Sequence, residues 1–247
     1  MNIMLNPTPT SRSWATAIWN RVLELDSVII GIFICVMAAY EWFAFYDGIG
    51  RIMPYYSQGF YWLSLLIILS ALGPTIYLTF AGIILVSSGQ PLSRYKTVLP
   101  NLLAVLAAFT PYMFVWMPKG SLFRVNAYVA LSFIVLGITI IILSLSFLRR
   151  AFSVTPQAKV LVTGGPYSLI RHPMYVGNIL SLFGMALLID SAEAMGLFFI
   201  CGSLQVGRAL YEEKLLQNNF HEYADYQNRV GCFVPRLLSY ARKLVTV

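Results

Sequence analysis

The residues best suited to chemistry gather in one short segment, Leu161–Gly177, between two apolar stretches of the chain. The segment combines hydroxyl, guanidinium and imidazole groups with glycine and proline turns; these residues are Thr163, Gly164, Gly165, Pro166, Tyr167, Arg171, His172, Pro173 and Tyr175. Farther along come Arg208, Glu212 and Glu213. Because only 11% of the residues are charged, this concentration of polar groups predicts a functional site.

The spacing indicates how these groups are presented. Pro173 suits the first turn of a helix, so His172 would lie at its start, where unpaired backbone amides and the helix dipole favour anions. Arg208 and Glu212 are four residues apart and so neighbours on one helix face. Each feature alone also fits a helix cap, a surface ion pair or interfacial tyrosines. Their combination favours a binding site.

The elements that must position this site are membrane helices. The mean hydropathy is +0.72 and 15% of the residues are aromatic, which is typical of an integral membrane protein. Apolar stretches long enough to span a bilayer predict helices at about 27–46, 60–86, 98–117 and 126–148. A helical hairpin follows at about 174–189 and 192–210, with its turn at Asp190–Glu193. The fold class is therefore an all-α, polytopic transmembrane helix bundle of about six spans.

The chain divides into two portions. Residues 1–148 form a membrane platform of about four spans that carries little chemistry, whereas residues 149–247 hold a polar linker, the hairpin and a C-terminal amphipathic helix. We expect Val160–Val162 to form a short extended piece. The amphipathic pattern predicts one continuous helix from about Val206 to Gln227, which would carry the hairpin's second arm out of the membrane.

The distribution of positive charge predicts the orientation. The net charge is +7, and with six crossings one side holds 14 of the Lys and Arg residues and the other holds three. Both termini and the site would then be cytoplasmic, and the charge indicates orientation and anionic head groups, not a nucleic acid. Cys35, Cys201 and Cys232 show no CxxC or Cys/His spacing, so no metal is expected.

The motifs together resemble a known family. Phe152–Gly177, Arg208-x3-Glu212-Glu213, Glu222-Tyr223-x2-Tyr226 and Pro235 are similar to the isoprenylcysteine carboxyl methyltransferases, with phosphatidylethanolamine N-methyltransferases more distant. The resemblance covers about 150–236. It implies an integral membrane enzyme that uses S-adenosylmethionine without a Rossmann domain, and the sequence contains no strand-GxGxxG-helix unit.

The resemblance also implies roles for individual residues. The positions that match the family's cofactor contacts are Lys159, Val160, Leu161, Val162, Tyr167, His172, Pro173, Met174, Tyr175 and Glu212. Arg208 matches the arginine that faces the methyl-accepting carboxylate. Lys159 stands where a histidine is common, and Phe152 stands where a cofactor-binding glutamine occurs, which makes Phe152 a poor ligand.

The chemistry of the side chains agrees with these roles. His172 and Arg171 suit the carboxylate of S-adenosylmethionine, a glutamate suits its ribose hydroxyls or ammonium, and the two tyrosines can flank its adenine or its sulfonium by cation–π attraction. Arg208 would orient a carboxylate acceptor bidentately, and Glu213 would serve as base for an amine acceptor. Arg208, Glu213 and Arg171 are therefore the catalytic candidates.

The predicted function is methyl transfer from S-adenosylmethionine to a lipophilic acceptor, most simply a carboxylate, that enters from the membrane lipids. Three alternatives remain. A phospholipid or lipid amine could be the acceptor. A sterol-reductase-like enzyme would bind NADPH, but only Arg149, Arg150 and Lys159 lie near for its 2′-phosphate. A non-enzymatic transport or scaffold module would be expected to carry charges at the membrane midplane.

Overall fold

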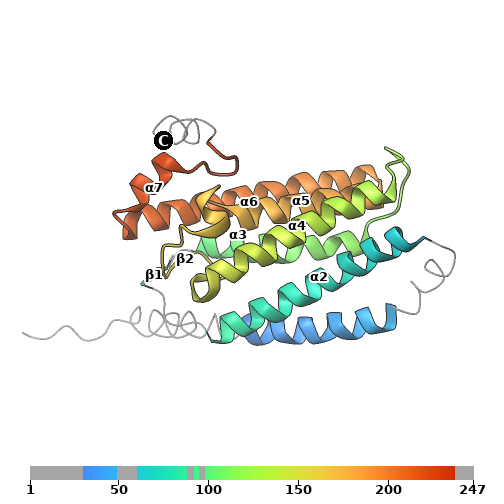
Figure 1. Cartoon of the computed structure of the whole chain (residues 1–247), viewed down its shortest axis with the longest axis horizontal. Helices are drawn as coiled ribbons and strands as arrows, with labels where there is room; N and C mark the ends of the chain where they lie inside the picture. Colours follow the sequence, from blue (N-terminus) through green and yellow to red (C-terminus); the bar gives the residue numbers. More distant parts are fainter. Residues whose placement is uncertain (1–29, 49–59, 88–91, 95–97, 237–247) are drawn as a thin grey trace, which may run out of the picture.

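The computed structural model describes residues 30–48, 60–87, 92–94 and 98–236, in which long helices pack side by side (Figure 1). The helices are a first one at Ile30–Gly48, then α2 (Tyr61–Val86), α3 (Val98–Phe109), α4 (Ala127–Leu148), α5 (Pro173–Ile189), α6 (Ala192–Asn219) and α7 (Tyr223–Arg229). Three 3-10 turns are η1 (Thr110–Trp116), η2 (Arg149–Ala151) and η3 (Gly165–Ser168). The only strands in the described residues are β1 (Ser93–Arg94) and β2 (Gln157–Ala158), so the all-α prediction is confirmed.

Five of the described helices are long and apolar enough to cross a membrane: Ile30–Gly48, Tyr61–Val86, Leu99–Trp116, Ala127–Leu148 and Ala192–Asn219. The sixth predicted span is α5, which is apolar but has 17 residues. At 1.5 Å per residue it is about 25 Å long, a little less than a hydrocarbon core of about 30 Å. The protein is therefore a multi-pass membrane protein in which one arm of the hairpin is short.

Helices α4 and α5 form the most extensive helix–helix interface, and glycine makes their close approach possible. A methyl group added at Gly137 would lie 2.5 Å from the carbonyl oxygen of Gly177, and one added at Gly177 would lie 2.6 Å from that of Gly137. Small residues let two backbones pack directly, as is common between membrane helices. This contact fixes α5, and hence the residues at its start, against the end of α4.

The hairpin turn lies where the sequence predicts it. Asp190 ends α5 in the left-handed conformation, with φ of 60°, and the Ser191 hydroxyl caps α6 by accepting from the Ala194 amide at 3.2 Å. The Asp190 carboxylate also accepts from the amides of Phe123 and Arg124, at 2.7 and 2.9 Å. The turn therefore also anchors the loop that precedes α4.

Two local predictions are wrong. The short strand is β2, at Gln157–Ala158, which pairs antiparallel with β1, and Val160–Val162 is irregular. The helix expected over Val206–Gln227 is interrupted: α6 ends at Asn219 and α7 begins at Tyr223. Asparagine at 218 and 219 is a weak helix former, and the break lets α7 fold back against the linker.

Candidate functional site

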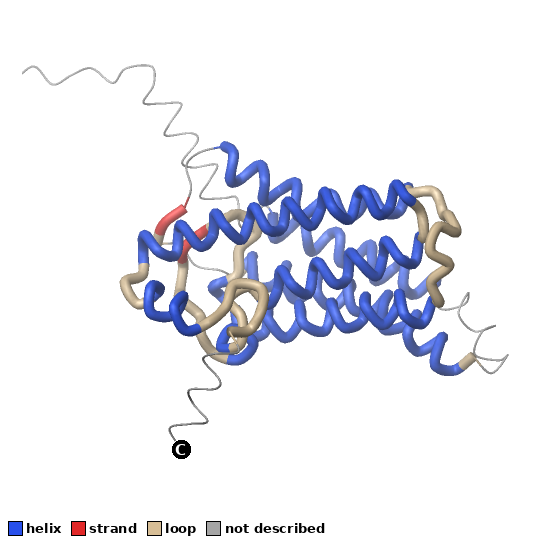
Figure 2. Tube along the Cα trace, turned by 90° about the horizontal axis from the view of Figure 1, so that it is seen from above, coloured by secondary structure: helices blue, strands red, loops and turns tan. Residues whose placement is uncertain are grey.

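A pocket lies at the end of the bundle where the linker, α6 and α7 meet. The two short strands and the linker gather at this end (Figure 2). The pocket is partly open to solvent. It is lined by Leu148, Ala151, Gln157, Val160, Leu161, Val162, Tyr167, Arg171, His172, Glu212, Leu216, Tyr223 and Tyr226. One part of this lining is aliphatic and the other is polar, so the pocket can receive a ligand with a ring and charged or hydroxyl groups.

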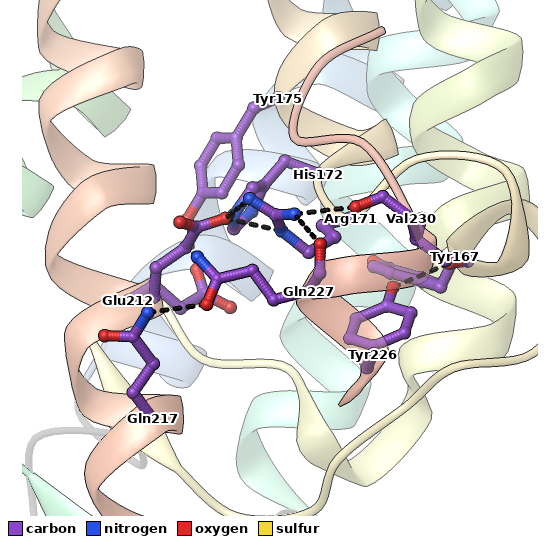
Figure 3. A network of polar contacts seen from close by, with 10 residues as sticks. Tyr167, Arg171, His172, Tyr175, Glu212, Gln217, Tyr226, Gln227 and Val230 are labelled. Carbon is purple, nitrogen blue, oxygen red and sulfur yellow. Dashed lines mark hydrogen bonds and ion pairs between the residues drawn. The ribbon is translucent and has the colours of Figure 1, made fainter. Parts of the chain in front are cut away.

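An ion-pair network fixes the polar side of the pocket (Figure 3). The Arg171 guanidinium donates from Nε and Nη2 to Oε1 of Glu213, both at 2.7 Å, and Nε2 of His172 lies 3.2 Å from the same oxygen. The side chains of Arg171 and Glu213 are 7% and 10% exposed. Because a buried charge is stable only when it is paired, Glu213 and Arg171 hold one another in place.

Arg171 also secures the chain after α7. Its Nη1 donates to the carbonyl oxygens of Gln227 and Val230, at 3.1 and 2.6 Å, which are left unpaired at the end of that helix. The backbone continues the contact, since the amides of Arg171 and His172 donate to the carbonyls of Gly231 and Cys232. The start of α5 is thereby tied to the segment that follows α7, which makes α7 a wall of the pocket.

Glu212, next in sequence to Glu213, has a different environment. Its Oε2 accepts a hydrogen bond from the Tyr175 hydroxyl at 2.6 Å, and the residue lines the pocket. One helical turn earlier on α6, the buried Arg208 donates from Nη2 to the Ser153 carbonyl at 3.0 Å. Its guanidinium carbon lies 5.3 Å from the centroid of the Tyr175 ring, a cation–π contact. Tyr175 therefore touches both the glutamate of the pocket and the arginine beside it.

The linker is shaped by local contacts. Lys159 is buried and donates from Nζ to the Phe152 carbonyl at 3.1 Å. Gly165 has φ of +59°, and a methyl group there would lie 2.4 Å from the Phe147 ring. Only glycine fits that conformation and that space. The turn brings Tyr167 into the pocket, where its carbonyl accepts from the Tyr226 hydroxyl at 2.6 Å.

Burial keeps the hydroxyls and the thiol of this region protonated. Burial, then the charge of Glu212, raises the pKa of Tyr167, and burial raises the pKa of Tyr226 to about 12. The pKa of Tyr223 is raised by burial and then by the charge of Glu213. Burial, followed by the charge of Glu213, raises the pKa of the Cys232 thiol to about 11. At neutral pH these groups are hydrogen-bond donors, not anions.

The structure brings many of the predicted site residues to this pocket. Those that line it are Val160, Leu161, Val162, Tyr167, Arg171, His172 and Glu212. Others lie behind its surface: Pro173 and Met174 are buried in the first turn of α5, and Lys159 bonds to Phe152. Tyr175, Arg208 and Glu213 are buried beside the pocket and contact its lining or the linker.

Sequence reasoning missed several lining residues. Tyr223 and Tyr226 were named only as part of a family motif and were given no role at the site, and Leu148, Ala151 and Gln157 were not singled out. The two tyrosines belong to the Glu222-Tyr223-x2-Tyr226 motif, which was the available signal. Gln157 gives no such signal, since its place depends on the pairing of β2 with β1.

One group of side chains in the described residues has the spacing of metal ligands: the donor atoms of His172, Glu213 and Cys232 lie within 4.8 Å of one another. The guanidinium of Arg171 already contacts Oε1 of Glu213 through Nε and Nη2. A metal ion needs the thiolate and an accessible carboxylate oxygen. The ion pair is therefore the better description of this cluster.

Comparison with known proteins shows which class the chain resembles. Residues 125–223 match the family model of the phospholipid methyltransferases. That range begins just before α4 and ends at the first residue of α7, so it contains the linker, the hairpin and most of the pocket lining. The segment matched by this family model is thus the same segment in which the motifs resemble membrane methyltransferases.

Particular relatives support the narrower resemblance. The chain is 37% identical over 78 residues to the protein-S-isoprenylcysteine O-methyltransferase of Saccharomyces cerevisiae, which covers 31% of this chain and 33% of that protein. The enzyme of the same name from Tribolium castaneum is 31% identical over 83 residues, 33% of this chain and 30% of that protein. The resemblance to the isoprenylcysteine carboxyl methyltransferase family is confirmed.

Two further relatives have different names. The cobalt-zinc-cadmium resistance protein CzcN of Cupriavidus metallidurans is 37% identical over 81 residues, 32% of this chain and 38% of that protein. The nickel-cobalt-cadmium resistance protein NccN of Alcaligenes xylosoxydans xylosoxydans is 37% identical over 78 residues, 31% of this chain and 37% of that protein. In each case the match spans well under half of the relative's length.

Proposed function

We propose that this protein is an integral membrane methyltransferase that uses S-adenosylmethionine and acts on a lipophilic acceptor, most simply a carboxylate. The observation that carries the proposal is the convergence of Val160–Val162, Tyr167, His172 and Glu212 on one pocket. These residues come from the linker, the start of α5 and the C-terminal third of α6, and they are the positions that the family resemblance assigns to the cofactor.

The pocket residues fit such a cofactor. Aliphatic side chains of the linker, such as Leu161, suit an adenine ring, and the Glu212 carboxylate suits hydroxyl or ammonium donors. When bound, S-adenosylmethionine supplies an electrophilic methyl group. The protein's own part is to hold it, to orient the acceptor and to exclude water.

Arg208 is the residue we assign to the acceptor. It is 7% exposed, and no carboxylate of the described residues pairs with it. A buried guanidinium without an anionic partner destabilises the folded protein, because its charge has lost the contact with water. An anion supplied by the substrate would therefore stabilise it. Arg171 is the contrast, because its guanidinium is already paired with Glu213 and two carbonyls. We therefore infer that Arg208 orients a carboxylate acceptor and that Arg171 positions the pocket wall.

An amine acceptor would need a base, and Glu213 was the candidate from the sequence. Its Oε1 is held by Arg171 and His172, which stabilise the charged carboxylate and make it a weaker base. The carboxylate acceptor, which needs no base, is therefore favoured over a lipid amine. We also propose that the pocket faces the cytoplasm, since the basic residues of the sequence gather on that side, and that the acceptor enters from the bilayer.

The test is methyl transfer by the full-length protein in lipid nanodiscs. Membrane lipid extract is incubated with methyl-labelled S-adenosylmethionine, and labelled lipids are identified by mass spectrometry. We expect a labelled ester that mild base releases as methanol, because methyl esters hydrolyse readily and methylated amines do not. Calorimetry with S-adenosylhomocysteine measures cofactor binding separately, with NADPH as the control ligand. Absence of saturable binding would overturn the proposal.

The names of two relatives raise metal resistance as a second candidate. Among the described residues, one cluster could bind a metal ion directly: His172, Glu213 and Cys232. The ion pair of Arg171 with Glu213 competes with such binding. Calorimetry with Cd²⁺ on the wild type and Cys232→Ser separates the two functions. Tight binding that Cys232→Ser abolishes would favour the metal site over the methyltransferase pocket as the functional centre.

A further inference from the structure

The hydroxyl of Tyr223 is buried without a hydrogen-bond partner among the residues that the structure describes. Tyr223 is the first residue of α7, is 1% exposed, and lines the pocket. A buried, unpaired hydroxyl destabilises a protein, so native structures nearly always satisfy such groups. The aromatic ring is in place, packed edge-on against Tyr226 at 5.8 Å between centroids. The hydroxyl therefore lacks a partner among the described residues, and a ligand in the pocket could supply one.

Neighbouring tyrosines make the contrast clear. Tyr226, three residues later on the same helix, donates to the Tyr167 carbonyl at 2.6 Å, and Tyr175 donates to Glu212 at 2.6 Å. Those two hydroxyls hold the pocket together. Tyr223 has the same hydroxyl group and is more deeply buried than Tyr226, but its hydroxyl forms no hydrogen bond with any described residue.

The surroundings restrict the partner. Burial and the charges of Glu213 and Glu212 keep Tyr223 protonated, so its O–H needs an acceptor. An ammonium group has no acceptor and would leave the O–H unpaired. A carboxylate is disfavoured as the partner of the Tyr223 hydroxyl. Glu213 already neutralises Arg171, and the negative charge of Glu212 in the pocket would repel a second anion. A hydroxyl group satisfies both neighbours, since it accepts from Tyr223 and donates to a carboxylate.

We propose that Tyr223 and Glu212 together bind the ribose hydroxyls of the nucleoside in this pocket, which makes Tyr223 a cofactor-binding residue. This inference rests on the proposed function, because it assumes that the pocket ligand is a nucleoside sulfonium or its product. A vicinal diol offers two donors and two acceptors, which matches one carboxylate and one phenol. The aliphatic lining contributed by Leu148, Ala151 and Leu161 would then contact the adenine ring.

The experiment compares Tyr223→Phe with Tyr226→Phe in full-length protein in nanodiscs. Thermal unfolding is followed by tryptophan fluorescence without ligand, and the affinity for S-adenosylhomocysteine is measured by calorimetry. For Tyr223→Phe we expect an unchanged or higher unfolding midpoint, with binding weakened about threefold to tenfold, the value of one neutral hydrogen bond. For Tyr226→Phe we expect a lower midpoint, because the Tyr167 carbonyl loses its donor.

Deoxy analogues of the ligand identify the group that Tyr223 contacts. Either 2′-deoxy- or 3′-deoxy-S-adenosylhomocysteine should bind the wild type more weakly than S-adenosylhomocysteine does. The Tyr223→Phe substitution should not reduce the affinity for that analogue any further. Equal affinity of Tyr223→Phe and wild type for S-adenosylhomocysteine would overturn the assignment, as would a lowered midpoint like that of Tyr226→Phe. A loss that persists with both analogues would overturn the ribose contact. If the wild type itself fails to bind S-adenosylhomocysteine, the proposed function fails instead.

Discussion

The same substitution at two adjacent glutamates should affect two different properties. Glu213→Gln should lower the stability of the protein, and Glu212→Gln should weaken cofactor binding. Glu213→Gln removes the charge that Arg171 contacts twice at 2.7 Å and that His172 approaches at 3.2 Å. Removing one partner of a buried ion pair costs about 3–5 kcal/mol. Since the glutamine oxygen can still accept, we take the lower end, about 3 kcal/mol. The unfolding midpoint of a protein of this size then falls by roughly 6–12 °C.

Glu212→Gln is the matched control, with the same change of charge and volume one residue away. Glu212 is half-buried, and an amide oxygen can accept from the Tyr175 hydroxyl as the carboxylate does. We expect its unfolding midpoint to change by less than about 3 °C. Cofactor binding should fall by about tenfold or more, because a hydrogen bond to a charged acceptor is lost at the pocket surface.

The assay is tryptophan-fluorescence unfolding in nanodiscs, with and without S-adenosylhomocysteine, together with calorimetry. In Glu213→Gln the ligand should still bind to the folded fraction and should raise the midpoint. Equal loss of stability in the two variants would refute the reasoning, because it would mean that both glutamates are structural. A wild-type midpoint in Glu213→Gln would show that the ion pair does not hold α7 in place.

Three further outcomes follow from the geometry. Arg208→Lys should lower methyl transfer by about a hundredfold while S-adenosylhomocysteine affinity stays within about threefold, because a lysine cannot bind a carboxylate bidentately; a parallel loss of binding would contradict this. Gly165→Ala should destabilise by about 2 kcal/mol, since φ is +59° and the methyl meets Phe147, whereas Gly164→Ala has open space and should be near neutral in the same unfolding assay. With a pKa of about 11, Cys232 as sole thiol should react with iodoacetamide at pH 8 at least tenfold more slowly than free cysteine and speed up above about pH 10; a rate equal to that of free cysteine would disprove the raised pKa.

The helices were predictable because the bilayer sets their length. The spans expected at about 60–86 and 126–148 are found at Tyr61–Val86 and Ala127–Leu148. Apolar runs of this length have few alternatives to a membrane helix. The interruption between α6 and α7 was not predictable in this way, since the apolar spacing continues through it. Asn218 and Asn219 favour a break locally, but the contact of Tyr226 with the linker, which holds α7 in its new direction, is tertiary.

The pairing of the polar residues depends on tertiary structure for the same reason. Helical spacing places Arg208 beside Glu212 and suggests that they pair. In the structure Arg208 donates to Ser153, Glu212 accepts from Tyr175, and the ion pair joins Glu213 to Arg171, which are 42 residues apart. Periodicity identifies the residues of a face but not the segment packed against it. The motif resemblance supplied the set of residues, and only the fold shows how they are partnered.

Tyr175 contacts two functional candidates of α6 at once. Its hydroxyl bonds to Glu212 on the pocket side, and its ring lies beneath the Arg208 guanidinium on the other. Because Arg208 and Glu212 stand one turn apart on α6, a single buried ring separates them. Under the proposed function, the ring lies between the cofactor and the acceptor carboxylate. Any shift of α5 relative to α6 would then disturb both partners together, which is a physical reason for the direct backbone packing of α5 on α4 at Gly137 and Gly177.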